Sequence, residues 1–147
     1  KIMKKVTKTI SGKNISQQWW LLDASDKVLG RFASEVAQVL RGKHRPDYSP
    51  NIYMGDAVII VNADKIRVTG NKSESKKYFR HSGYPGGVKY ASFNDLMKND
   101  SDKVLLSAVK GMLPKNKLGR EILRHIRIYK DTNHGHEAQK PKEWSSN

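Results

Sequence analysis

The chain has 147 residues, 37% of them hydrophobic, which suits one small folded domain with a modest core. Its 28 Lys and Arg exceed its 14 Asp and Glu by 14, and this excess of positive charge favours a polyanionic partner, most commonly nucleic acid. The absence of Cys excludes disulfide frameworks, thiolate zinc sites and cysteine nucleophiles, and no apolar run approaches the roughly 20 residues of a membrane helix.

The first 18 residues form a basic segment. They contain five Lys and no acidic residue, and they lack the apolar stretch of a secretory signal. We expect residues 1–18 to be a flexible arm that becomes ordered on RNA. Residues 19–147 are expected to form a single α/β RNA-binding domain, with an extended tail from about residue 131.

A strand, a helix and a second strand are predicted in the first half of this domain. Trp19–Leu22 is a short apolar run, residues 30–41 have apolar side chains at helical spacing, and Gly42 supplies the helix stop. The five apolar residues Ala57–Val61 do not alternate with polar ones, which is typical of a strand buried on both faces of a parallel sheet. Together these segments predict a βαβ unit. Its expected core includes Phe32, Val36, Val58 and Ile60.

Shorter elements are predicted in the second half. Strands are expected at Ile66–Thr69 and Lys76–His81, the latter leading into a glycine-rich loop around Tyr84. Ser92 is predicted to cap a helix, with Asp95 three residues later as its capping-box partner.

The basic C-terminal third is predicted to contain two more helices and a strand. One helix covers about Lys103–Leu113, and a second follows the bend at Pro114 before a strand at Ile126–Tyr129. The predicted fold class is α/β, with three layers, a small mostly parallel sheet covered by helices, and basic N- and C-terminal extensions. The residues expected to face the core are Val109, Met112, Leu118, Ile122 and Ile126.

Candidates for catalysis and metal binding are weak. Asp23, Asp56 and Asp64 lie at predicted strand ends, where α/β enzymes often place functional groups, but turn formation explains the same positions. His134-Gly135-His136 lacks a clear third metal ligand, and no glycine-rich nucleotide motif follows the first strand. We expect no enzyme activity, no cofactor and no metal. The alternative is a basic α/β nucleic-acid-processing enzyme, such as a metal-dependent nuclease.

Clusters of basic residues are more informative. Residues 41–45 place four basic side chains after the first helix, and residues 110–130 contain seven Lys or Arg with one acid, Glu121. Solvated helix faces usually mix signs, so this imbalance favours phosphate contact. Gly111 and Gly119 have no side chain to keep RNA away from the backbone. Further basic residues flank the glycine-rich loop: Lys72, Lys76, Lys77, Arg80 and Lys89.

One segment of the basic C-terminal third closely resembles the signature of the universal large-subunit ribosomal protein thirteen family. This segment is Lys110-Gly111-Met112-Leu113-Pro114-Lys115-Asn116-Lys117-Leu118-Gly119-Arg120. The match runs in order from about Trp19 to Pro141 and is closest to the bacterial or organellar branch. It departs at Trp19, where the family commonly has a polar or charged residue. The other matching motifs are Trp20-Leu21-Leu22-Asp23-Ala24, Leu29-Gly30-Arg31, Arg41-Gly42-Lys43-His44, Gly55-Asp56, Asn62-Ala63-Asp64-Lys65, Thr69-Gly70-Asn71-Lys72, His81-Ser82-Gly83, Gly86-Gly87 and His136-Glu137-Ala138-Gln139-Lys140-Pro141.

The resemblance implies a structural constituent of the large ribosomal subunit that binds and stabilises large-subunit ribosomal RNA during assembly, without catalysis. Its implied partners are that RNA and neighbouring large-subunit ribosomal proteins, with no membrane and no small-molecule substrate. It implies a cytoplasmic location, in the ribosome, and leaves an organellar ribosome open. The RNA contacts that the resemblance implies are Arg41, Lys43, His44, Asn71, Lys72, His81, Gly83 and His134, together with the segment Lys110 to Arg120. The basic residues of that segment are Lys110, Lys115, Lys117 and Arg120. Helical spacing adds Arg124 to this outward-facing set.

Overall fold

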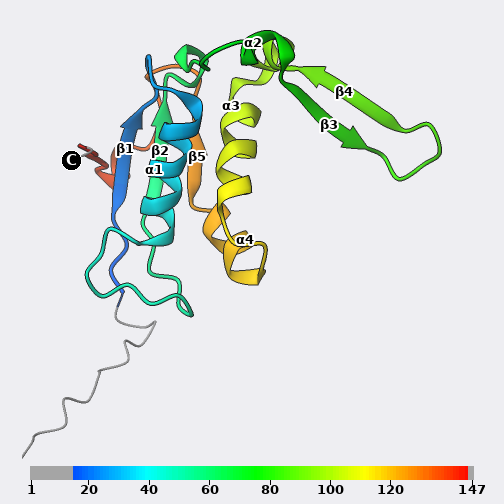
Figure 1. Cartoon of the computed structure of the whole chain (residues 1–147). Coiled ribbons are helices and arrows are strands. Elements are labelled where there is room, and N and C mark those ends of the chain that lie inside the picture. Colours follow the sequence, from blue (N-terminus) through cyan, green and yellow to red (C-terminus); the bar gives the residue numbers. More distant parts are fainter. Residues whose placement is uncertain (1–14, 146–147) are drawn as a thin grey trace, which may run out of the picture.

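The computed structural model describes residues 15–145, with the arrangement drawn in Figure 1. Most of the basic arm predicted over residues 1–18 lies outside the described residues. The helices and strands are β1 (Trp19–Asp23), α1 (Leu29–Arg41), β2 (Ala57–Val61), α2 (Lys72–Ser75), β3 (Lys77–His81), β4 (Val88–Ser92), α3 (Phe93–Met112), α4 (Lys117–Leu123), β5 (Ile126–Ile128) and β6 (Lys142–Glu143). Short 3-10 turns lie at Ala63–Lys65 and Glu137–Gln139.

Four strands form a parallel sheet in the order β5-β2-β1-β6. β1 and β2 are neighbours with α1 between them in the chain, which confirms the predicted βαβ unit and the α/β fold class. The register places Leu22 beside Ile60. The polar C-terminal segment was expected only to be extended, but its residues Lys142 and Glu143 add β6 to the edge of the sheet.

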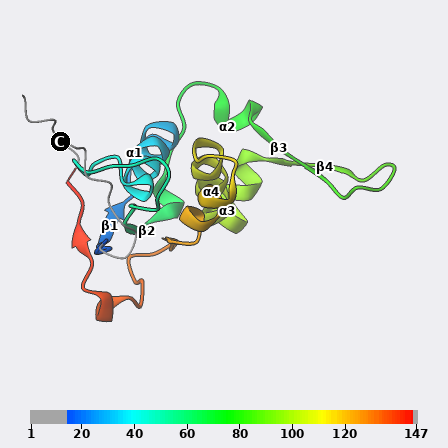
Figure 2. The ribbon, with the colours of Figure 1, turned by 90° about the horizontal axis from the view of Figure 1, so that it is seen from below.

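The main core lies between the sheet and the helices α1, α3 and α4. Phe32 and Val36 of α1 are buried with Val58 and Ile60 of β2, as predicted. Successive strand side chains point to opposite faces, so Trp19 lies on the other face of the sheet from Trp20. There His136 stacks on Trp19, with the ring centroids 5.7 Å apart. Figure 2 shows α1 on one side of β1 and β2 and the C-terminal segment on the other, where it forms the third layer.

Gly42 ends α1 as predicted. Its φ of +80° is in the left-handed region, and its N–H donates to the carbonyl oxygens of Gln38 and Val39. A Cβ at this position would lie 2.6 Å from the carbonyl oxygen of Met54. Glycine is therefore required here both by the backbone conformation and by the close approach of the loop before β2.

The prediction of a strand at Ile66–Thr69 is wrong. The chain forms a single parallel bridge there, between Arg67 and Val28. Pairing stops after one residue because Val28 is the N-cap of α1, so the partner chain turns into a helix immediately afterwards. Ile66 is nevertheless buried, which explains its apolar side chain.

The two helices predicted around Ser92 and Lys103 form one span, α3, interrupted at Asp100, whose φ of −140° and ψ of 62° are not helical. Ser92 caps the span as predicted, since its Oγ accepts the Asp95 N–H at 3.1 Å and donates to the Asp95 carboxylate at 2.6 Å. Neither α3 nor another helix within residues 15–145 is long and apolar enough to cross a membrane.

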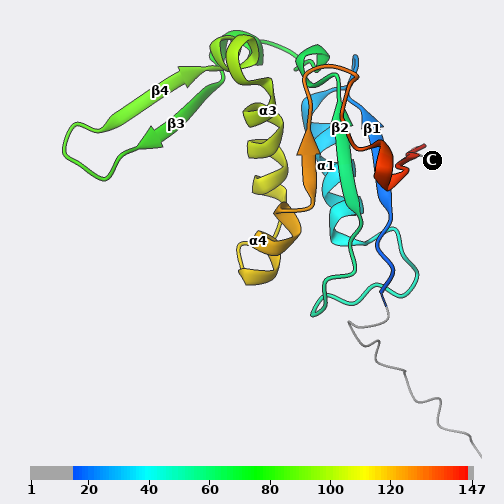
Figure 3. The same ribbon diagram turned by 180° about the vertical axis from the view of Figure 1, so that it is seen from behind.

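The strand predicted at Lys76–His81 is present as β3, and it pairs with β4, which was not predicted. The two form an antiparallel hairpin. Figures 1 and 3 show that this hairpin projects away from the sheet and the other helices. Only its base packs on the core, through the half-buried Tyr78.

The predicted inward face of the C-terminal third needs one correction. Met112 is 44% exposed because α3 ends there and the extended residue Leu113 is buried in its place. Ile126 is buried in β5, in agreement with the strand predicted at Ile126–Tyr129, and α4 ends before it at Leu123. Val109 and Ile122 are buried and Leu118 packs against the core as predicted.

Candidate nucleic-acid interface

A tight turn of four residues, Leu113–Asn116, connects α3 to α4. Asn116 caps α4, because its side-chain oxygen accepts the N–H of Gly119 at 2.7 Å. Gly119 is buried, and a Cβ there would lie 1.8 Å from the carbonyl oxygen of Pro114. The turn therefore holds the end of α3 and the start of α4 close together in a defined geometry.

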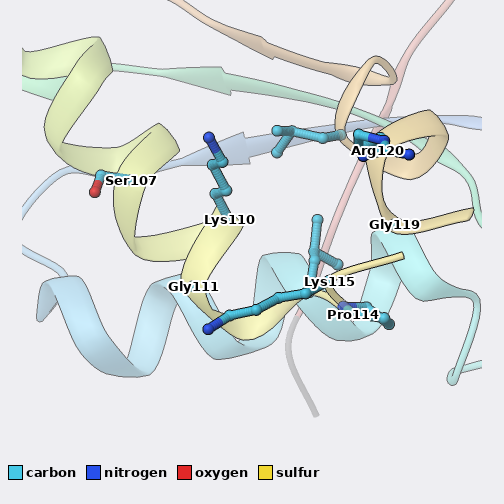
Figure 4. Close-up of a pocket in the computed structure, with 9 residues that line it drawn as sticks. Ser107, Lys110, Gly111, Pro114, Lys115, Gly119 and Arg120 are labelled. Atoms are coloured by element: carbon cyan, nitrogen blue, oxygen red, sulfur yellow. The ribbon is translucent and has the colours of Figure 1, made fainter. Parts of the chain in front are cut away.

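A basic hollow of about 610 Å³ lies beside this turn. Figure 4 shows Lys110 at the end of α3, Lys115 in the turn and Arg120 on α4, with their side chains around the same space. All three residues are exposed, as is Lys117 nearby. Within residues 15–145 none of these four side chains forms an ion pair. A concave surface with several unneutralised cations is suited to binding phosphate groups.

Arg41 and Lys43 border the same end of the molecule. Together with Met112 they line a hollow of about 190 Å³. Arg41 also lines a second, smaller hollow with Pro114 and Asn116 of the turn. The structure thus brings these two predicted RNA contacts next to the predicted C-terminal group, although about 70 residues separate them in the chain.

Arg124 differs from the other basic residues of this segment. Its guanidinium lies 3.2 Å from the Glu121 carboxylate, and both side chains are mostly exposed. An exposed pair of this kind stabilises the fold little. The Arg124–Glu121 pair does neutralise part of the positive charge that is predicted to bind RNA.

His44 is predicted to contact RNA, but its ring points into the protein. Its Nε2 lies 2.9 Å from the buried Asp56 carboxylate, and its ring packs edge-on against Trp144 at 5.4 Å. Arg45 also turns inward and donates to Asp56. Of the four basic side chains in residues 41–45, those of Arg41 and Lys43 line surface hollows, whereas those of His44 and Arg45 contact Asp56.

Asp56 is 1% exposed and connects three segments of the chain. It accepts the backbone N–H of Gln18 at 2.9 Å and the indole N–H of Trp20 at 3.0 Å, in addition to its contacts with His44 and Arg45. Burial alone would raise the pKa of Asp56, but hydrogen bonds from Gln18, Trp20 and Arg45 outweigh burial and hold that pKa below its usual value.

The other predicted contacts lie in separate places. Asn71 and Lys72 are exposed at the start of α2, at the opposite end of the sheet from α4. His81 and Gly83 are exposed near the tip of the hairpin. His134 is half-buried, and its Nδ1 accepts the N–H of His136 at 3.0 Å. The thirteen candidates therefore do not form one patch.

The three aspartates considered for catalysis do not converge. Asp56 precedes β2, whereas Asp23 ends β1 at the other end of the sheet. Asp23 accepts the N–H of Ser25 at 3.0 Å and the side chain of Asn62 at 2.9 Å, as expected for a turn residue. Among residues 15–145, no group of three or more His, Cys, Asp or Glu is placed to hold a metal ion. This geometry gives no support to the nuclease alternative.

Comparison with known proteins decides the family. A model of the family described as Ribosomal protein L13 matches residues 17–135. The chain belongs to this family. Three similar relatives are each called Large ribosomal subunit protein uL13. The relative from Laribacter hongkongensis is 50% identical over 92% of this chain and 96% of its own length. The relative from Crocosphaera subtropica is 50% identical over 97% of this chain and 95% of its own length. The relative from Aquifex aeolicus is 48% identical over 92% of this chain and 94% of its own length.

Two exposed aromatic residues of this Ribosomal protein L13 family member were missed in the sequence, namely Phe79 and Tyr90. Both lie on the hairpin, and Tyr90 belongs to the unpredicted strand β4. The alternation in Val88-Lys89-Tyr90-Ala91, directly after the turn residues Gly86-Gly87, is the signal that would have predicted β4.

Gly119→Ala is expected to lower the free energy of unfolding by about 1–3 kcal/mol, because the new Cβ overlaps the Pro114 carbonyl oxygen and the turn must move. Gly111→Ala is the matched control. It lies in α3 with no atom within 4 Å of the new Cβ, so it should leave stability unchanged or raise it by up to about 1 kcal/mol. Urea denaturation of both variants measures the difference. Equal effects would contradict a structural role for Gly119, which was predicted instead to admit RNA.

Proposed function

We propose that this chain is a structural constituent of the large ribosomal subunit that binds and stabilises large-subunit ribosomal RNA during assembly and catalyses no reaction. Membership of the Ribosomal protein L13 family supports this function, together with relatives that are named as large-subunit proteins and match nearly the whole chain. The observation that carries the RNA-binding part is the basic hollow, where Lys110, Lys115 and Arg120 meet without acidic partners among residues 15–145.

We further propose that residues 19–147 act as one RNA-binding domain, with residues 1–18 as a basic arm. In this arrangement the rigid turn between α3 and α4 holds several cations at fixed separations, so they can neutralise phosphates from more than one RNA segment. Arg41 and Lys43 extend the same binding surface. Asn71, Lys72, His81, Gly83 and His134 are proposed as contacts to other RNA segments, with Arg124 at the margin of the hollow.

The proposed partners are large-subunit ribosomal RNA and the ribosomal proteins beside it, and the proposed location is the ribosome in the cytoplasm. Bacterial relatives favour this location over an organelle. His44 is proposed to act indirectly, since its ring is held by Asp56 and supports the loop that carries Lys43.

Sedimentation of cell extracts tests the proposal. The full chain with an affinity tag should sediment with large ribosomal subunits in a sucrose gradient and remain with them after a wash in moderate salt. A chain found only at the top of the gradient, or equally on both subunits, would contradict the proposed function.

A further inference from the structure

The hairpin formed by β3 and β4 has features that the basic hollow does not explain. Its turn is closed by the Ser82 N–H, which donates to the Gly87 carbonyl at 3.1 Å, and Gly83 and Gly86 have φ of +91° and +72°. Residues 75–94 contain no Asp or Glu. Since the hairpin projects from the body, as Figure 3 shows, both its faces are open to a partner.

One face of the hairpin is aromatic. The antiparallel register places Phe79 opposite Tyr90 and His81 opposite Val88, and opposite residues share a face. The ring of Phe79 lies 5.7 Å from that of Tyr90 and 6.4 Å from that of His81. Phe79 is 63% exposed and Tyr90 is 67% exposed. Large exposed apolar groups in contact with one another mark an interaction surface.

The opposite face is cationic. Arg80 and Lys89 are direct cross-strand partners, an arrangement of like charges that destabilises an isolated hairpin. Neither side chain forms an ion pair within residues 15–145, and Asp100 on the adjacent helix is paired with Lys103 at 2.8 Å. With Ser82 and Gly87, the two cations line a hollow of about 130 Å³. An anion in this hollow would relieve their repulsion.

We propose that the hairpin is a two-sided finger for unpaired RNA. Bases stack on the face formed by Phe79, His81 and Tyr90, and a phosphate of the same RNA lies between Arg80 and Lys89 on the other face. This deepens the proposed ribosomal function and rests on it. The absence of acidic residues from the hairpin favours RNA over a protein partner, because aromatic rings with cations and no anions suit stacked bases and phosphates.

The double variant Phe79→Leu, Tyr90→Leu tests the aromatic face, because it keeps apolar side chains but removes the rings. Its matched control, Phe79→Tyr, Tyr90→Phe, exchanges the two rings. The probe is a single-stranded oligouridylate with one 2-aminopurine, whose fluorescence falls when it stacks on an aromatic ring. We expect the leucine variant to lose this quenching and to bind roughly tenfold more weakly, and the control to behave as the unmodified full chain does.

The variant Arg80→Gln, Lys89→Gln tests the cationic face. For a single strand, losing the contact with this one phosphate should flatten the slope of log affinity against log salt by about 0.7. The leucine variant should leave that slope unchanged. Circular dichroism of each variant checks that the fold, whose core lies away from the hairpin, is retained.

Two results would overturn the proposal. One is unchanged quenching and affinity in a folded leucine variant. The other is normal RNA binding by variants that no longer join large subunits, which would identify a protein as the partner. Failure of the unmodified chain to sediment with large subunits would contradict the ribosomal function alone, because the oligouridylate measurement reports on the hairpin directly.

Discussion

Asp56→Asn should lower the free energy of unfolding by about 3 kcal/mol. The amide keeps the shape of the carboxylate but not its charge, so it leaves the Arg45 guanidinium without its anion and places an N–H₂ group among donors. We expect the lower end of the range for broken buried pairs, because the Arg45 side chain is 17% exposed and water can still reach it.

Asp23→Asn is the matched control for this measurement. Asp23 also accepts three hydrogen bonds, but it is exposed at the end of β1 and forms no ion pair among the described residues. Its replacement should cost about 1 kcal/mol or less. Urea denaturation of both variants at pH 7 makes the comparison. Equal losses of unfolding free energy in the two variants would show that the buried contacts of Asp56 stabilise the fold no more than the turn contacts of Asp23 do.

Acid titration gives a second test of the same site. The pKa of Asp56 is lowered in the folded protein, so its contribution to stability is complete above the unfolded value of about 3.9 and is lost as pH falls through the lower folded value. The difference in unfolding free energy between the parent protein and Asp56→Asn should therefore narrow below about pH 4. A constant difference down to pH 2 would contradict a lowered pKa.

Burial of apolar side chains explains two of the elements that the sequence predicts correctly. β2 is apolar at five successive positions and buried at all five, and α1 has an apolar stripe with a glycine stop. β4 and β6 escaped prediction because neither is apolar. β4 is mostly exposed on a projecting hairpin, and the two residues of β6 are held by backbone pairing with β1.

The sequence predicts which residue types form the candidate site, but not which way each side chain points. An excess of Lys and Arg identifies a binding segment, yet Lys43 and Arg45 look alike in the sequence. Arg45 turns inward because Asp56, 11 residues later, is buried beside it. Gly111 and Gly119 also look alike, but only Gly119 is packed against a carbonyl oxygen. Such differences depend on contacts between distant segments, which residue spacing does not encode.

Replacing Lys115, Lys117 and Arg120 together by Ala should weaken binding to large-subunit ribosomal RNA by roughly a hundredfold, taking about 1 kcal/mol for each lost phosphate contact. All three side chains are exposed around the turn between α3 and α4, and within residues 15–145 none has an acidic partner. Their removal costs the fold little, because they support neither the core nor a capping hydrogen bond. The cap of α4 is Asn116, which is kept.

Charge alone could produce part of this loss, so the control variant removes the same charge elsewhere. Lys65, Arg67 and Lys98 are exposed at the other end of the sheet from α4, as Figure 1 shows for the elements around them. Their joint replacement by Ala should weaken binding much less, because it removes long-range attraction but no direct contact, and attraction between exposed charges is screened beyond about 10 Å at 0.1 M salt.

The salt dependence of binding separates the two variants most clearly. Each direct phosphate contact releases counterions, so the variant of the basic hollow should flatten the slope of log affinity against log salt by about three, and the control by less than one. Affinity is measured at several salt concentrations, with circular dichroism confirming that each variant is folded. If both variants changed the slope equally, the cations of the hollow would be a solvated basic surface, and the RNA contacts of this chain would have to lie elsewhere.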